Sequence, residues 1–214
     1  MKTLFAIPSF LECQALFPLA VTQVGKLFKI PKQEIYVSVL GVGLVEFSKN
    51  LTTLLLQETF DQIVLLGIAG AYKNSGLSLG EVVFVTSECV GDLGIENPDF
   101  SFTPWHAVAH ENLKTYQADL KKIPDYIKPL KQVFGVSLNC TTGSEKVAKS
   151  RESLFQASVE SMEGAAFYSI GNAFQIPCFE IRAISNFVTH RDKSSWKIKE
   201  ALQALKQTIN PLLL

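Results

Sequence analysis

Short runs of apolar residues recur along this chain at intervals that leave room for helices between them. Two of the runs, residues 4–7 and 63–66, contain no polar side chain at all. Strands without alternation of polar and apolar residues are buried on both faces, which is typical of a parallel sheet covered by helices. The predicted strands are residues 4–7, 35–40, 63–66, 81–86, 132–138 and 178–184.

Helical periodicity is found between these strands, most clearly over residues 44–58. Further helices are predicted over residues 11–19, 163–174 and 194–209. Strands that alternate with helices predict a three-layer α/β/α fold, in which helices cover both faces of a central mixed, mostly parallel sheet. No stretch rich in Pro, Gly or Ser interrupts the chain, so we expect residues 1–214 to form a single domain.

Charge and cysteine content limit the classes of ligand that the protein could bind and indicate the cellular compartment. Twenty basic residues balance twenty acidic ones, so no net charge attracts nucleic acid or an anionic membrane. The longest apolar stretch, residues 63–72, is far too short to span a bilayer. The four cysteines show no C-x-x-C spacing, and the three histidines form no metal pattern. We therefore predict a cytoplasmic protein with reduced thiols, a small-molecule ligand, and no metal or organic cofactor.

Polar and small residues gather where the predicted strands end, at the edge of the sheet where α/β proteins bind ligands. Glu12 follows the first strand, Gly-Ile-Ala-Gly (67–70) follows the third, and Arg-Ala-Ile-Ser-Asn (182–186) ends the last. Ser-Met-Glu-Gly-Ala-Ala (161–166) opens the preceding helix. Each has an ordinary explanation when taken singly, because Glu12, for example, could simply complement a helix amino terminus. The Gly-Val-Gly turn at 41–43 lacks the third glycine of a dinucleotide site.

Taken together and in their order along the chain, the segments resemble the nucleoside phosphorylase/nucleosidase superfamily. The likeness runs over essentially the whole chain, and it is closest to the hydrolytic branch, which holds the methylthioadenosine/S-adenosylhomocysteine nucleosidases and the futalosine hydrolases. The resemblance implies that Glu12 activates the attacking water, that Glu163 binds ribose hydroxyls and that Met162 packs against the sugar. Carboxylates suit these roles, because breaking an N-glycosidic bond builds positive charge on the ribosyl ring.

Water is favoured over phosphate as the nucleophile for a local reason. A phosphate nucleophile needs backbone N–H groups and usually an arginine near the end of the first strand. Residues 8–11 read Pro-Ser-Phe-Leu, with neither glycine nor arginine. We therefore expect hydrolysis, with a phosphate-dependent phosphorylase as an alternative.

Asn186 stands where the adenine-specific nucleosidases of this family carry an aspartic acid that protonates purine N7. Asparagine cannot be that acid, but its carbonyl can face an N7 proton and its amide NH₂ an oxygen at C6. This pairing suits a 6-oxopurine and, within the resemblance, indicates the futalosine hydrolases, which release hypoxanthine from futalosine in menaquinone biosynthesis. The alternatives are an adenine-releasing methylthioadenosine/S-adenosylhomocysteine or aminodeoxyfutalosine nucleosidase, and a nucleoside-binding protein without turnover.

The segment after Asn186 is predicted to contact the 5′ side of the nucleoside. Futalosine carries an aromatic carboxylate there, which Arg191 or Lys193 could pair and on which Trp196 could stack. A solvated loop with an amino-terminal helix cap at Ser194 or Ser195 is the alternative for these residues.

Three further contacts are implied by the resemblance. Gly70 ends the small-residue segment beside the substrate, and Val147 lies in the segment that clamps the base. Phe102 belongs to an aromatic loop, residues 97–105, which in the family covers the substrate of the neighbouring subunit. We therefore expect a homodimer with this loop near the interface, and an intramolecular apolar cluster is the alternative.

Overall fold

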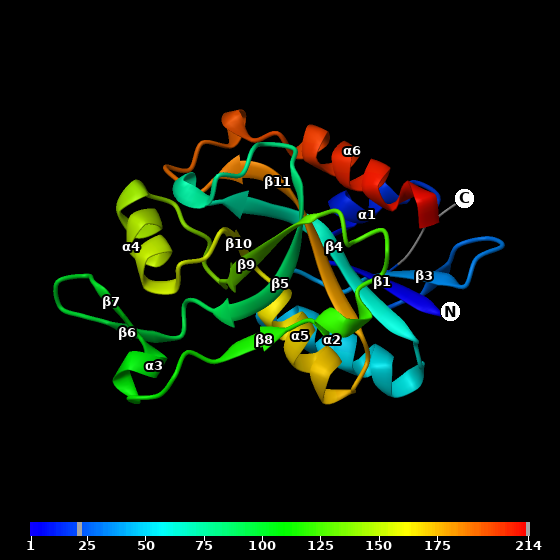
Figure 1. The fold of residues 1–214 in the computed structure, drawn as a ribbon, viewed down its shortest axis with the longest axis horizontal. Helices are drawn as coiled ribbons and strands as arrows, with labels where there is room; N and C mark the ends of the chain where they lie inside the picture. Colours follow the sequence, from blue (N-terminus) through cyan, green and yellow to red (C-terminus); the bar gives the residue numbers. More distant parts are fainter. Residues whose placement is uncertain (21–22, 213–214) are drawn as a thin grey trace.

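The computed structural model describes residues 1–20 and 23–212 and has a mixed α/β architecture (Figure 1). Among these residues nine strands form the central sheet. Six of them lie where the apolar runs predict strands, and three short ones were not predicted. In chain order they are β1 (Thr3–Ile7), β2 (Phe28–Lys29), β3 (Ile35–Val39), β4 (Gln62–Ala71), β5 (Val82–Val90), β8 (Thr115–Gln117), β9 (Lys131–Ser137), β10 (Val159–Ser161) and β11 (Cys178–Phe187).

The strand order is β10-β9-β5-β11-β4-β1-β3-β2, with β8 paired to β5. Parallel pairing joins β3, β1, β4 and β11 at one side of the sheet. At the other side β11 runs antiparallel to β5, while β9 is parallel to both β5 and β10. Because β10 also pairs with β4, this side curls into a closed ring of five strands. The sheet is therefore mixed, as predicted.

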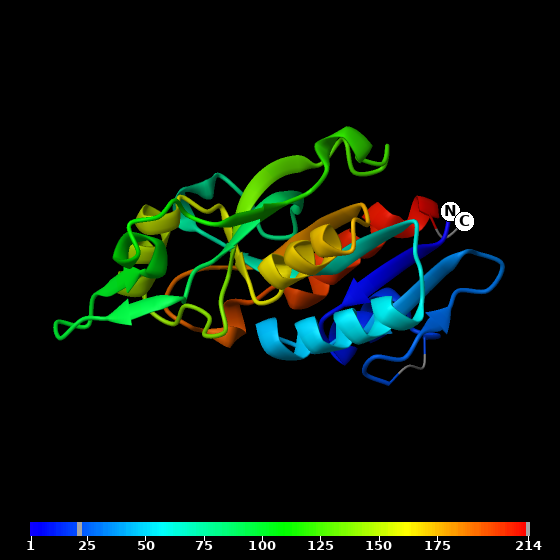
Figure 2. The same ribbon diagram turned by 90° about the horizontal axis from the view of Figure 1, so that it is seen from below.

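Helices cover both faces of the sheet, which confirms the three-layer prediction. The helices α1 (Phe10–Leu16) and α6 (Ile198–Ile209) lie on one face, and α2 (Leu44–Gln57) and α5 (Gly164–Ala173) lie on the other (Figures 1 and 2). Near one end of the molecule, α4 (Glu145–Phe155) and the short α3 (Trp105–Val108) flank the sheet. None of the helices in the described ranges is both long and apolar enough to cross a bilayer.

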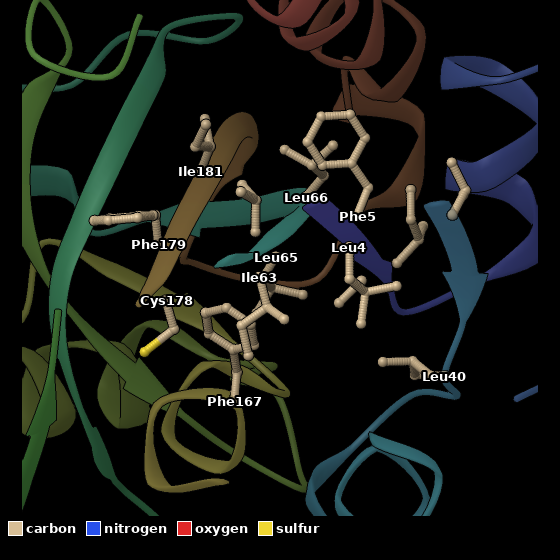
Figure 3. Close-up of a cluster of buried hydrophobic side chains, with 14 of the residues drawn as sticks. Leu4, Phe5, Leu40, Ile63, Leu65, Leu66, Phe167, Cys178, Phe179 and Ile181 are labelled. Atoms are coloured by element: carbon tan, nitrogen blue, oxygen red, sulfur yellow. The ribbon is translucent and has the colours of Figure 1, made fainter. Parts of the chain in front are cut away.

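The core is built from the predicted apolar strands and the inner faces of the helices. Leu4, Phe5, Ile63 and Leu65 are fully buried at the centre of the sheet, with Phe167 of α5 beneath them (Figure 3). Burial of this kind stabilises each side chain by about 1.5–3 kcal/mol. The strands are thereby fixed, and their carboxyl ends form a rigid edge on which a site can be built.

Several boundaries differ from the prediction, and three of them lie beside the cavity or close to it. The first helix ends at Leu16 rather than at residue 19, because Pro18 disfavours helical backbone at the residue before it. The last helix begins at Ile198, and residues Lys193–Ser195 form a separate 3₁₀ turn. Residues 67–70, predicted as a loop, instead continue β4, since β10 and β11 both pair with the end of this strand.

A small hairpin projects from the body of the protein (Figures 1 and 2). Its strands are β6 (Gly94–Glu96) and β7 (Phe102–Pro104), which pair with each other in a separate two-stranded sheet. We call residues 93–105 the arm.

Candidate active site

A cavity of about 440 Å³ opens at the carboxyl ends of β1, β4, β10 and β11. Seven separate segments of the sequence reach it, so the sheet brings together residues that are far apart in the chain. Seven of the nine predicted site residues line its wall. They are Glu12, Gly70, Met162, Glu163, Asn186, Arg191 and Trp196.

Glu12 is held at the start of α1 by the cap of that helix. The Ser9 backbone N–H and hydroxyl both donate to Glu12 Oε2, at 3.1 and 2.5 Å. The backbone N–H of Ile68, from β4, donates to Oε1 at 3.0 Å. Burial raises the pKa of Glu12, and the charge of Glu163 adds to this effect, while these hydrogen bonds and Arg182 oppose it. Glu12 therefore caps helix α1 and also lines the cavity as a buried carboxylate, so the two roles are compatible.

Glu163 immediately precedes α5 and makes no capping bond to its own helix. Its Oε1 accepts the backbone N–H of Gly43 at 3.0 Å, and its Oε2 accepts Arg182 Nη2 at 3.1 Å. Gly43 has a φ of 84°, a left-handed conformation that favours glycine, which explains one glycine of the Gly-Val-Gly turn. This turn thus fixes the second carboxylate of the cavity from 120 residues away.

Arg182 links the buried carboxylates of the site. Its side chain is 1% exposed, and it donates to Glu180 Oε1 at 2.7 Å and to the Ile68 carbonyl at 3.3 Å, besides Glu163. Burial alone would lower its pKa, but the charges of Glu180 and Glu163 outweigh burial and raise it. Arg182 is therefore a permanent cation, and its hydrogen bond to Oε2 orients the carboxylate of Glu163.

A further acid, Glu88 of β5, completes this buried cluster. Ser137 donates to its Oε2 at 2.9 Å, but Glu88 Oε1 and Glu180 Oε2 have no hydrogen-bond partner among the described residues. Both of these oxygens lie within 2.6 Å of the position that a Cβ atom at Gly164 would take. Burial, and then the charge of Glu180, raise the pKa of Glu88 well above its ordinary value. A protonated Glu88 would supply the donor that Glu180 lacks.

Asn186 lies near the end of β11 and faces the cavity. Its Oδ1 accepts the Ser185 hydroxyl at 2.8 Å, and its Nδ2 donates to the Phe187 carbonyl at 3.2 Å. One amide hydrogen and one carbonyl lone pair are left over. Both kinds of group are thus available to a ligand in the cavity.

Arg191 and Trp196 lie together at one side of the cavity. The guanidinium carbon of Arg191 is 6.0 Å from the centroid of the Trp196 ring, which is within the range of a cation–π contact. Lys193 does not line the cavity, and neither Ser194 nor Ser195 caps α6, whose amino-terminal cap is Lys197. Of the two cations predicted to contact the 5′ side of the nucleoside, only Arg191 lines the cavity.

Two predicted site residues, Val147 and Phe102, do not line the cavity of this chain. Val147 lies in the first turn of α4 and is 40% exposed. Phe102 lies in β7 and packs against a small apolar cluster around Tyr72 and Val136. The intramolecular cluster that the sequence left open thus exists for Phe102.

Other cavity residues were not among the predicted site residues. Arg182 belongs to the motif at residues 182–186, but no sequence pattern shows that its side chain turns inward to two carboxylates. Glu160 and Thr142 also line the cavity, and Glu160 is 7% exposed. Its position two residues before Met162, in a strand of only three residues, gave no periodic signal.

Comparison with known proteins shows the family to which this chain belongs. The chain belongs to the phosphorylase superfamily, whose family model matches residues 20–213. A futalosine hydrolase of Thermus thermophilus is 30% identical over 177 residues, which cover 81% of this chain and 78% of the relative. An aminodeoxyfutalosine nucleosidase of Campylobacter jejuni is 24% identical over 163 residues, covering 74% and 70% of the two chains.

Solved structures support the fold. The futalosine hydrolase of Helicobacter pylori superposes with a TM-score of 0.77 at 16% identity, covering 99% of this chain and 97% of the other. A 5′-methylthioadenosine/S-adenosylhomocysteine nucleosidase of Neisseria meningitidis, in complex with methylthio-immucillin-A, gives 0.78 at 18% identity, with coverages of 99% and 98%. At these identities the likeness concerns the fold alone.

Proposed function

We propose that this protein is a futalosine hydrolase, which releases hypoxanthine from futalosine in menaquinone biosynthesis. The observation that carries the proposal is the meeting of Glu12, Glu163 and Asn186 on one cavity, two carboxylates with an amide in place of a third. The Thermus thermophilus relative carries the name of this enzyme and matches most of the chain.

The two carboxylates would divide the chemistry of hydrolysis between them. Glu12 takes a proton from water as the new C1′–O bond forms and the C1′–N9 bond breaks, and the purine departs with the bonding electron pair. Its raised pKa makes Glu12 a stronger base, a role worth about 10²–10⁴-fold in rate. Glu163, fixed by Gly43 and Arg182, accepts ribose hydroxyls and stabilises the developing positive charge of the ring.

The leaving base would contact a neutral group, Asn186, and the 5′ substituent would contact a cation, Arg191. Asn186 can hydrogen-bond the departing base without supplying a proton, which suits hypoxanthine because its anion is stable. Arg191, supported by Trp196, is the cation for an aromatic carboxylate. Replacing Arg191 with Met should raise KM for futalosine and leave KM for methylthioadenosine, which lacks a carboxylate, unchanged.

The protein would act as a cytoplasmic homodimer with residues 97–105 near the interface. All four cysteines are free and Cys140 is exposed, which suits a reducing compartment. The arm holds the exposed apolar side chains Ile95, Phe100 and Trp105, and Phe100 is 81% exposed. Such a surface favours contact with a second chain.

Base release without phosphate tests the activity. Futalosine, aminodeoxyfutalosine, methylthioadenosine and inosine are each incubated with the protein, and the free base is measured by chromatography. We expect hypoxanthine from futalosine, and a loss of at least about 10²-fold in kcat for Glu12→Gln. The matched control is Glu34→Gln, which changes an exposed acid directly before β3 and should keep full activity.

The possible results separate the candidate functions. Adenine from aminodeoxyfutalosine or methylthioadenosine, with no base from futalosine, would identify the adenine-releasing alternative. Base release only after phosphate is added would identify a phosphorylase. Ligand-induced stabilisation without any base release would identify a binding protein.

A further inference from the structure

Glu160, Gly70 and Asn186 form one row across three neighbouring strands. In the register of the sheet Glu160 of β10 lies opposite Gly70 of β4, and Asn186 of β11 lies opposite Gly70 from the other side. Side chains that are paired across neighbouring strands point to the same face of a sheet. All three residues line the cavity, so an acid and an amide flank a glycine on the cavity wall.

The glycine keeps the space between the two polar side chains open. A Cβ atom at residue 70 would lie 3.1 Å from Asn186 Nδ2 and 3.6 Å from the Cγ atom of Glu160. It would also lie 2.9 Å from the Val188 side chain, closer than real Cβ contacts. Neighbouring strands are about 4.8 Å apart, so the backbones of Glu160 and Asn186 lie roughly 10 Å apart, and their side chains approach each other over Gly70. A flat heterocycle can lie over Gly70 with one edge facing both side chains.

Hydrogen bonds fix the carboxylate of Glu160 as an acceptor. The Thr142 backbone N–H donates to Oε1 at 2.9 Å, while the Thr142 hydroxyl and the Tyr72 hydroxyl donate to Oε2 at 2.6 and 3.1 Å. Arg151 Nη1 donates to the Thr142 hydroxyl oxygen at 2.8 Å, so the hydroxyl hydrogen is directed at Glu160. Burial, and then the charge of Glu160, raise the pKa of Tyr72, which keeps the phenol protonated as a donor.

One position on this carboxylate is left for a ligand. Each carboxylate oxygen can accept two hydrogen bonds, and Oε1 accepts one from Thr142. A carboxylate this deeply buried is costly unless its lone pairs are used. Asn186, across the glycine, still has an amide hydrogen to donate. The row therefore presents an acceptor and a donor side by side.

We propose that Glu160 reads the base, with Oε1 accepting the N1–H of a 6-oxopurine while the amide of Asn186 donates to the adjacent O6. The inference rests on the proposed nucleosidase function and names the residue that sets its base preference. A 6-aminopurine has a bare lone pair at N1 and a donor at C6, so it would face like groups at both positions. Mismatches of this kind in a site built for hydrogen bonding cost on the order of 10⁴-fold in selectivity.

The test compares futalosine with aminodeoxyfutalosine, which differ at C6 of the base, in wild type and Glu160→Gln. A glutamine amide can donate to a bare N1, so the ratio of kcat/KM for the two substrates should fall by at least about tenfold. Tyr72→Phe is the matched control, because it removes one donor to Glu160 and leaves the acceptor; its ratio should stay as in wild type. Glu160→Asp, which withdraws the carboxylate but keeps its charge, serves if the glutamine variant does not fold.

Binding of the free bases, measured by calorimetry, provides a second readout that needs no turnover. Wild type should bind hypoxanthine more tightly than adenine, and Glu160→Gln should lose that preference. If wild type hydrolyses futalosine but the variants keep both preferences, the role of Glu160 is overturned and the proposed function stands. If wild type hydrolyses neither nucleoside but shows the base preference and its loss, the function fails and the role of Glu160 stands.

Discussion

The buried charge cluster around Arg182 and the arm are opposite cases. The cluster holds charged groups in the protein interior, and the arm holds apolar groups at the surface. Inside the sheet, Arg182, Glu163 and Glu180 are charged groups withdrawn from water, and the ion pairs between them offset the cost of their burial. On the arm, Ile95 and Phe100 are apolar groups left in water, and no described residue of this chain covers them. The charges of the cluster are thus paired within one chain, whereas the apolar side chains of the arm stay exposed. Changes in the cluster should therefore alter stability and chemistry together, and changes in the arm should alter neither within the monomer.

The largest effect is expected from Arg182→Met. The variant leaves Glu163 and Glu180 buried without their shared cation, and breaking a buried pair in this way costs about 3–5 kcal/mol. Activity should fall too, because Glu163 loses the group that orients it. Urea unfolding and base release measure the two effects. Arg182→Lys, which keeps the charge but loses the planar fork, should lie between wild type and Arg182→Met. A loss of stability below about 1 kcal/mol for the methionine variant would mean that the cluster is not held together by Arg182.

A smaller effect, with a distinctive pH dependence, is expected from Glu88→Gln. The pKa of Glu88 is raised in the native state, so the folded protein binds a proton that the unfolded chain releases above its ordinary value near 4.5. The stability that this proton provides is present at low pH and lost as the pH rises through the native pKa. Glutamine keeps a donor toward Glu180 at every pH. We expect the variant to gain on the order of 1 kcal/mol at pH 8 and to lose less stability between pH 5 and 8.

Urea unfolding at several pH values measures this difference. Glu34→Gln, an exposed acid of similar size, should reproduce the wild-type slope. Glu88 is faced by Glu180, Arg182 and Glu163, so an unchanged slope in Glu88→Gln would assign the proton to Glu180 instead.

The cluster and the arm also differ in how far they can be predicted from the sequence. The strands β1 and β4 are apolar throughout most of their length, and the motifs at their ends located Glu12 and Gly70. Glu163 and Asn186 were found in the same way. Both stand at the end of a predicted strand or helix, and this position can be recognised without knowing which residues they contact. The resemblance to a family then added roles that spacing alone does not give.

What the sequence could not supply was the contacts between distant segments. Glu88 and Glu180 lie within strands whose pattern shows only burial, and nothing in it indicates that the two acids meet beside Gly164. Glu160 was missed because β10 is too short to show a period. The helix α4 was missed because its sequence is largely polar, with only Ala148 and Phe155 buried.

The smallest effect on the monomer is expected from changes in the arm, and it provides the clearest contrast with the cluster. Ile95 and Phe100 are exposed, so replacing both with Asp should change the monomer's free energy of unfolding by no more than about 0.5 kcal/mol per site. If the arm lies at a homodimer interface, the same variant should be monomeric at micromolar concentration, where wild type is dimeric. Sedimentation velocity distinguishes the two states. Leu56→Asp, which changes an exposed apolar residue of α2 outside the arm, should remain dimeric. A wild-type protein that sediments as a monomer would show that the exposed side chains of the arm serve no partner of the same sequence.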